Sequence, residues 1–256
     1  MTEHVDVNGE PCRLWRKGNG ARIGFLAGFS GMPKWIPFLD RLAEKYEVVV
    51  PSIPGYPGAD GFRKLDTHVD WLVAVRELLE GAGLTDDAIL VGSGPGGSFA
   101  AEMAALWPNS VKRLALIAPW GIYDEKAPMR DPWAQTPASV AEIMVENPDL
   151  WNELRKTPEG ANSVEFPIEQ TRVLEASARA FWPLGDTGLV KRLRRVTCPT
   201  LLVWGANDKV LPPANAKTFQ REIEGKTKLV TIAGAGHLAE LDKPDETAKA
   251  IIDFVG

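Results

Sequence analysis

An apolar run near the middle of the chain ends in a cluster of glycines: Ile89-Leu90-Val91-Gly92-Ser93-Gly94-Pro95-Gly96-Gly97. Small residues follow as far as Ala105, which is typical of a helix that packs closely against its neighbours. A strand that turns through glycines directly into a helix is the setting of a nucleophile elbow, which holds one side chain above a parallel sheet. A phosphate loop is not favoured because the stretch lacks its lysine, and a dinucleotide site is not favoured because this is not the first strand–helix unit.

Apolar strand candidates alternate with helical patterns on both sides of this stretch. A hairpin around Asn8-Gly9 comes first, because this dipeptide readily adopts the positive φ angles of a tight turn. The strand candidates are residues 23–27, 48–50, 88–91, 114–118, 201–204 and 229–232, and the helical patterns are residues 34–44, 67–80, 96–107, 214–223 and 245–254. Continuous apolar strands separated by helices predict an α/β fold with a mostly parallel sheet covered on both faces.

The alternation is interrupted between Trp120 and about Gly188 by a segment rich in aromatic residues and prolines. We expect residues 120–188 to form a helical lid over an apolar pocket, and residues 1–119 and 189–256 to form the core domain. Trp120, Trp133 and Trp182 are predicted to line this pocket. The alternative for each of them is a small subdomain in which the aromatic residues pack only against each other.

Composition narrows the classes of partner. The 256 residues carry a net charge of -5 without long runs of one sign, so we do not expect nucleic acid or membrane surfaces as partners. The expected partner is a small-molecule substrate. The two cysteines, Cys12 and Cys198, lack the spacing of a zinc site or a disulfide framework. The sequence shows no apolar signal-peptide core and no apolar stretch of the roughly 18 to 20 residues that a membrane span requires, so we expect a cytoplasmic protein. We expect no metal and no cofactor, and the sequence leaves a homodimer open.

Three segments together resemble the α/β-hydrolase superfamily, in particular its small capped esterases and its carbon–carbon bond hydrolases of the meta-cleavage product type. Residues 90–97 are similar to the superfamily's elbow, Gly-x-nucleophile-x-Gly-Gly. Residues 202–208, which end at Asp208, are similar to the strand and turn that deliver its acid, and residues 234–237, which end at His237, to the loop that delivers its histidine. The resemblance covers nearly the whole chain and implies the α/β-hydrolase fold with Asp208 and His237 as acid and base.

The chemistry of this pair does not depend on the resemblance. A carboxylate that accepts from one imidazole nitrogen sets the tautomer and leaves the other nitrogen free to take a proton.

Two residues depart from the superfamily's pattern. Gly94 stands at the nucleophile position, and glycine can neither attack a carbonyl nor hold an acyl group. Ser93 is adjacent, but its side chain is expected to point away from the tip of the turn, which makes it a weak substitute. Pro95 stands where a backbone N–H normally stabilises the oxyanion, and the loss of one such donor typically costs about 3 to 4 kcal/mol. The loop at Gly28 and Phe29 is expected to supply the other donor.

Three functions remain open. In the first, His237 and Asp208 act as general base or acid on a small apolar carbonyl or phenolic compound without a covalent intermediate, by hydrolysis, lyase or cyclase chemistry. In the second, a serine esterase or carbon–carbon hydrolase had its serine at position 94 replaced by glycine to trap substrate. In the third, the pocket binds a ligand and performs no chemistry. We favour the first because Gly94 and Pro95 depart together while Asp208 and His237 are present.

Overall fold

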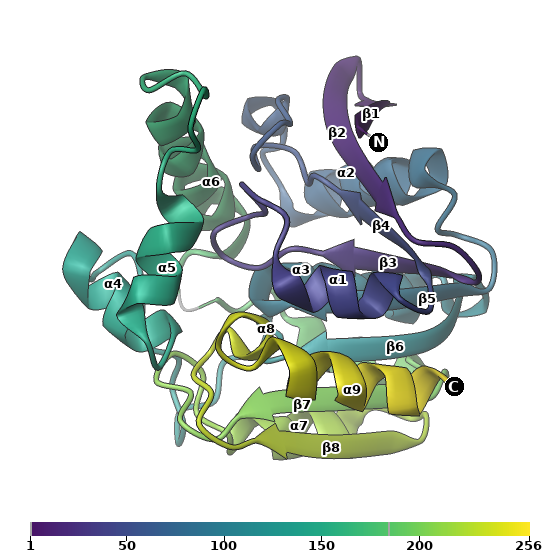
Figure 1. The fold of residues 1–256 in the computed structure, drawn as a ribbon. Helices are drawn as coiled ribbons and strands as arrows, with labels where there is room; N and C mark the ends of the chain where they lie inside the picture. Colours follow the sequence, from purple (N-terminus) through teal and green to yellow (C-terminus); the bar gives the residue numbers. More distant parts are fainter. Residues whose placement is uncertain (1, 184) are drawn as a thin grey trace.

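The computed structural model describes residues 2–183 and 185–256. Within these residues, eight strands form one sheet in the order β1-β2-β4-β3-β5-β6-β7-β8 (Figure 1). β1 and β2 are antiparallel to their neighbours, and all the pairs from β4 to β8 are parallel. The strands are β1 Thr2–Val7, β2 Glu10–Lys17, β3 Arg22–Leu26, β4 Glu47–Pro51, β5 Ala88–Ser93, β6 Val111–Ile117, β7 Thr200–Gly205 and β8 Thr227–Ile232. The predicted mostly parallel sheet is confirmed.

The predicted hairpin is formed by β1 and β2. Asn8 and Gly9 adopt φ angles of 52° and 79°, the left-handed backbone of a tight two-residue turn, and Val7 pairs with Glu10 directly across it.

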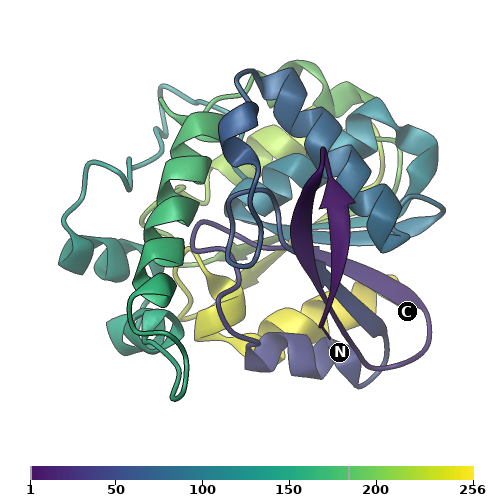
Figure 2. The same ribbon diagram turned by 90° about the horizontal axis from the view of Figure 1, so that it is seen from above.

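Helices cover both faces of the sheet, as the alternating pattern predicts. α1 (Pro37–Ala43) and α9 (Pro244–Val255) lie side by side on one face, and α2 (His68–Ala82) and α3 (Gly94–Leu106) lie on the other (Figure 2). α7 (Asn215–Glu222) connects β7 to β8. Nearly every residue of α3 is buried, because its small side chains allow it to lie directly against β5 and β6. The helix that carries the elbow is therefore held in the centre of the molecule.

Three further helices lie between β6 and β7 and form a separate layer beside the sheet (Figure 1). They are α4 (Pro137–Met144), α5 (Pro148–Arg155) and α6 (Glu165–Phe181). This layer occupies the segment predicted as a lid, and its action as a lid stays a prediction. A short helix that the sequence pattern does not indicate, α8 (Ala239–Asp242), follows the loop after β8.

Candidate active site

The elbow lies at the end of β5, where the chain enters α3 at Gly94. Gly94 has a φ of +46°, in the left-handed region that side chains rarely adopt. A side chain at Gly96 would collide with the backbone carbonyl of Leu26 in β3, so the turn needs glycine there for close packing. This tight turn places Gly94 at the carboxyl end of the sheet's central strands, where ligands bind in such folds.

The corner above Gly94 is faced by His237. A Cβ atom built on Gly94 would lie 3.4 Å from His237 Nε2 and 3.5 Å from Trp120 Nε1, which are ordinary contact distances. The register inferred from the sequence therefore brings the nucleophile position and the imidazole together.

Asp208 and His237 form a buried, fully hydrogen-bonded pair, which we call the dyad. His237 Nδ1 and Asp208 Oδ2 are 2.9 Å apart, and both side chains are fully buried. Asp208 Oδ1 accepts from the backbone N–H groups of Val210 and Leu211 at 2.9 and 2.8 Å, so both carboxylate oxygens are engaged. These contacts hold the acid in one rotamer and orient the imidazole toward the elbow.

Trp120 occupies the side of the imidazole that faces the elbow. Its indole Nε1 donates to His237 Nε2 at 3.0 Å, and its backbone N–H donates to the Gly94 carbonyl at 3.0 Å. An indole nitrogen can only donate, so Nε2 must accept and Nδ1 must carry the proton that it donates to Asp208. The imidazole is therefore neutral, with its basic lone pair at the corner above Gly94. The sequence marks Trp120 as an aromatic residue of the pocket but does not indicate this hydrogen bond.

The Ser93 side chain lies against Gly28 and Glu240, and its weak role as a substitute nucleophile stays a prediction. Its hydroxyl lies 3.1 Å from the position that a Cβ on Gly28 would occupy. It lies beside Glu240, a fully buried residue of α8 that the sequence analysis missed. Burial raises the pKa of Glu240 to about 7, against the opposing effects of the Ser93 hydroxyl and of His237. The sequence feature that could have pointed to Glu240 as a residue of the site is its place three residues after His237.

Aromatic side chains cluster around the elbow. The Phe29 ring lies 5.6 Å from Trp120, 5.5 Å from Trp133 and 6.5 Å from Trp151, measured between ring centroids. The prediction for Trp182 was wrong: its side chain is 61% exposed, and the preceding residue, Phe181, contacts Trp120 at 5.9 Å. The sequence could not make this distinction, because α6 ends at Phe181 and one residue decides which ring faces inward.

The site lacks one of the two backbone N–H donors that an oxyanion hole normally has. Pro95 is buried at the start of α3 and supplies no N–H group. Gly28 and Phe29 are also buried, in the loop after β3 that reaches the elbow, so the Phe29 N–H stays the predicted donor.

A second buried charge cluster lies outside the dyad, around Glu102 of α3. Glu102 is fully buried and accepts from Arg192 through both nitrogens Nε and Nη2, and it also contacts His68 Nε2 at 3.2 Å. These hydrogen bonds and charges hold the pKa of Glu102 below its usual value in spite of burial. The cluster connects α2 and α3 to the segment before β7, so we assign it a structural role.

Among the described residues, His, Cys, Asp and Glu side chains form no group of three that could hold a metal ion. None of the described helices is both long and apolar enough to cross a membrane.

Comparisons with known proteins agree with this geometry. The model of the Alpha/beta hydrolase family matches residues 25–250. Monoacylglycerol lipase ABHD6 of Homo sapiens is 25% identical, with 94% of this chain and 77% of that protein aligned. The dihydrolipoyllysine-residue acetyltransferase component of the acetoin cleaving system of Cupriavidus necator is 29% identical, with 95% and 66% aligned. The solved structure of a meta-cleavage product hydrolase (CumD) from Pseudomonas fluorescens superposes with a TM-score of 0.78 at 17% identity, covering 99% and 97% of the two chains, and shows the shared fold.

Proposed function

Because the chain belongs to the alpha/beta hydrolase family, we propose that it is an enzyme that uses His237 and Asp208 for proton transfer on a small apolar carbonyl or phenolic compound, without a serine acyl-enzyme. One observation carries the proposal: the Nε2 lone pair of a neutral, buried imidazole faces a corner that holds no nucleophile. Such a lone pair can accept a proton from a substrate or from a water molecule.

The hydrogen bond from Trp120 defines how a substrate would enter. A substrate with an acidic hydrogen would replace the indole N–H on Nε2, so one hydrogen bond is exchanged for another. His237 would then take the proton, and Asp208 would stabilise the imidazolium that forms. Positioned proton transfer of this kind contributes on the order of a hundredfold to ten-thousandfold. In the hydrolytic form of the reaction, a water molecule at the Gly94 corner would be activated in the same way.

The substrate class follows from the surroundings of the dyad. Phe29, Trp120 and Trp133 form an apolar wall beside it, and the chain is similar in sequence to a monoacylglycerol lipase and in fold to a meta-cleavage product hydrolase. These features support a small apolar substrate.

A base-dependent probe reaction tests the proposal. The ring opening of 5-nitrobenzisoxazole needs only the abstraction of a carbon-bound proton by a base, with no nucleophile. We expect turnover in the intact protein, at least a hundredfold loss in His237→Ala, and partial loss in Asp208→Asn, which disfavours the basic tautomer. His4→Ala, in the N-terminal hairpin, is the matched control and should leave the rate unchanged. Equal rates in all four proteins would contradict the proposal, as would labelling of Ser93 by a fluorophosphonate.

A binding protein without turnover is the second candidate. The observation that favours it is that Trp120 caps His237 Nε2 while the imidazole is fully buried. In that case, His237→Ala would leave ligand affinity nearly unchanged, and no probe reaction would depend on His237.

A further inference from the structure

A separate cavity of about 330 Å3 lies between the loop after β3 and the α4–α6 layer. We call it the Arg155 cavity. Its apolar wall comprises Phe29, Trp133, Val140, Trp151 and Leu174, and Arg155 lines it at the end of α5. This volume lies at the lower end of the range for small-molecule sites, and apolar walls with a few polar groups are typical of such sites.

Arg155 is a partly buried cation with no counter-ion among the described residues. Its Nη1 is inaccessible to solvent and has no hydrogen-bond partner in residues 2–183 and 185–256, and its Nη2 makes only a long hydrogen bond of 3.4 Å to the Gln170 carbonyl. Burial lowers the pKa of the guanidinium, and no carboxylate in the described part of the chain opposes this shift. Removing part of a charged group from water without giving it a partner is unfavourable, so the site favours an anion.

A second unpaired polar group lies next to Arg155. Gln170 of α6 is 4% exposed, and neither its side-chain oxygen nor its side-chain nitrogen has a partner within the described residues. Its backbone carbonyl is the acceptor for Arg155 Nη2, so the two groups without partners are neighbours.

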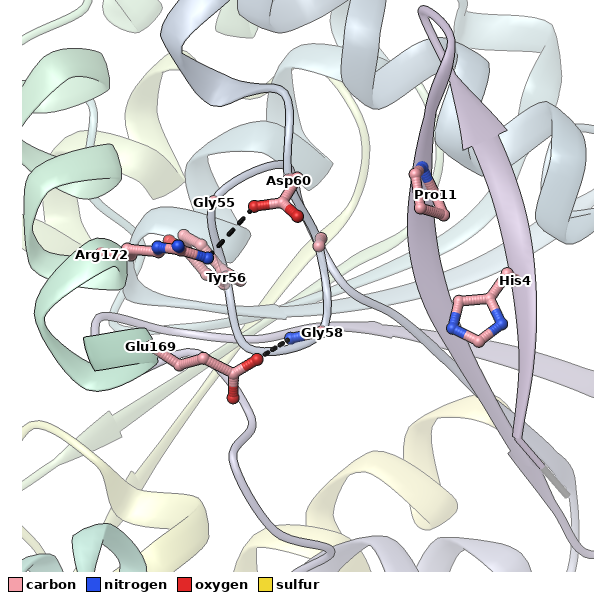
Figure 3. A pocket seen from close by; sticks show the side chains of 9 residues that line it. His4, Pro11, Gly55, Tyr56, Gly58, Asp60, Glu169 and Arg172 are labelled. Carbon is pink, nitrogen blue, oxygen red and sulfur yellow. Dashed lines mark hydrogen bonds and ion pairs between the residues drawn. The ribbon is translucent and has the colours of Figure 1, made fainter. Parts of the chain in front are cut away.

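The pocket in Figure 3 provides a contrast, because its charged groups already pair with the protein. Arg172 Nη1 contacts Asp60 Oδ1 at 3.3 Å, and Glu169 Oε1 accepts from the Gly58 N–H at 3.3 Å. The pocket between the hairpin, the loop after β4 and α6 is therefore electrostatically satisfied without a ligand, whereas the Arg155 cavity is not.

We infer that the Arg155 cavity binds an apolar monocarboxylate, with its carboxylate on the Arg155 guanidinium and its apolar body against Trp133, Trp151 and Leu174. A carboxylate matches the fork of the guanidinium and cancels its single charge. A phosphate dianion would leave a net negative charge in an apolar enclosure, so it fits less well. Trp151, whose ring lies 5.2 Å from the guanidinium carbon, would contact both the cation and the ligand body.

The cavity adjoins the dyad without including it. Phe29 lines the cavity and contacts Trp120, and Trp120 contacts His237, so one aromatic layer separates a ligand in the cavity from the imidazole. Binding in the Arg155 cavity does not depend on turnover at His237.

Binding of 3-phenylpropionate and of its uncharged analogue 3-phenylpropionamide tests this inference. Calorimetry gives the affinities, and the quenching of Trp133 and Trp151 fluorescence reports the position. The acid should bind at least tenfold more tightly than the amide. Arg155→Gln should weaken the acid at least tenfold and leave the amide unchanged, and Arg172→Gln, in α6 at the pocket of Figure 3, should change neither.

Three results would overturn the inference: no measurable binding of the acid, equal affinities for acid and amide, or the same acid affinity in Arg155→Gln as in Arg172→Gln. Val140→Trp keeps the test decisive where Arg155→Gln disturbs α5. It fills the cavity from α4 and should abolish the binding of both compounds, and unchanged binding would place the ligand elsewhere.

Discussion

Replacing Gly94 with serine should convert the empty corner into a reactive nucleophile. The new Cβ would lie 3.4 Å from His237 Nε2, so one staggered rotamer brings Oγ within hydrogen-bonding distance of the lone pair that Trp120 now caps. The φ of +46° at this position costs a side chain about 1 to 2 kcal/mol, so the variant should fold with slightly reduced stability.

The same variant should be a poor esterase, because Pro95 supplies no oxyanion donor. Loss of one such donor lowers kcat by about a hundredfold to a thousandfold. Gly94→Ser should therefore react with a fluorophosphonate and hydrolyse p-nitrophenyl acetate slowly, and Gly94→Ser/Pro95→Ala should hydrolyse it at least a hundredfold faster.

Gly94→Ala, which has the same backbone strain without a hydroxyl, is the control for both measurements. If Gly94→Ser folds but is labelled no more than Gly94→Ala, the assignment of position 94 to the nucleophile corner is wrong. If the double variant is no faster than the single one, the account of Pro95 is wrong.

Three further changes test the buried polar groups and the close packing. The pKa of Glu240 is about 7 in the folded protein and near 4.5 in the unfolded chain. Between these two values the folded protein keeps a proton that the unfolded chain has lost, so the free energy of unfolding should fall as the pH rises. The expected decrease is about 3 kcal/mol between pH 4.5 and pH 7. Urea unfolding should show that Glu240→Gln removes this part of the slope, and an unchanged slope would contradict it. Glu102→Ala removes the carboxylate that pairs with Arg192 and His68, so the free energy of unfolding in urea should fall by about 3 to 5 kcal/mol. Asp253→Ala, which removes an exposed ion pair, should leave the free energy of unfolding unchanged within error. Gly96→Ala places a methyl group against the Leu26 carbonyl and should abolish soluble, folded protein. Gly160→Ala, with open space around it but a φ of +78°, should lose only about 1 to 2 kcal/mol and retain a cooperative thermal transition.

Short-range patterns in the sequence were enough to predict the architecture. Alternating apolar runs and helical periods predicted the parallel strands and the helices on both faces, and Asn8-Gly9 predicted the hairpin turn. These features depend on neighbours within one or two turns of chain, so they can be read locally. The sites of Gly94, Asp208 and His237 came from the resemblance to the α/β-hydrolase superfamily, and in the structure each lies in the turn or loop that follows a strand, β5, β7 and β8 respectively.

Tertiary packing decided the features of the site that have no local signal. The Trp120 indole donates to an imidazole 117 residues further along the chain, Glu240 is buried beside Ser93, and Phe181 rather than Trp182 joins the aromatic cluster. Arg155 Nη1 is shielded from solvent without a hydrogen-bond partner because helices α4, α5 and α6, between β6 and β7, together line the cavity around it. Local sequence determined which backbone elements form, and the motifs after β5, β7 and β8 indicated where the dyad stands. Which polar groups end up buried, capped or unpaired depends on the sum of many long-range contacts, and no single stretch of residues encodes that sum.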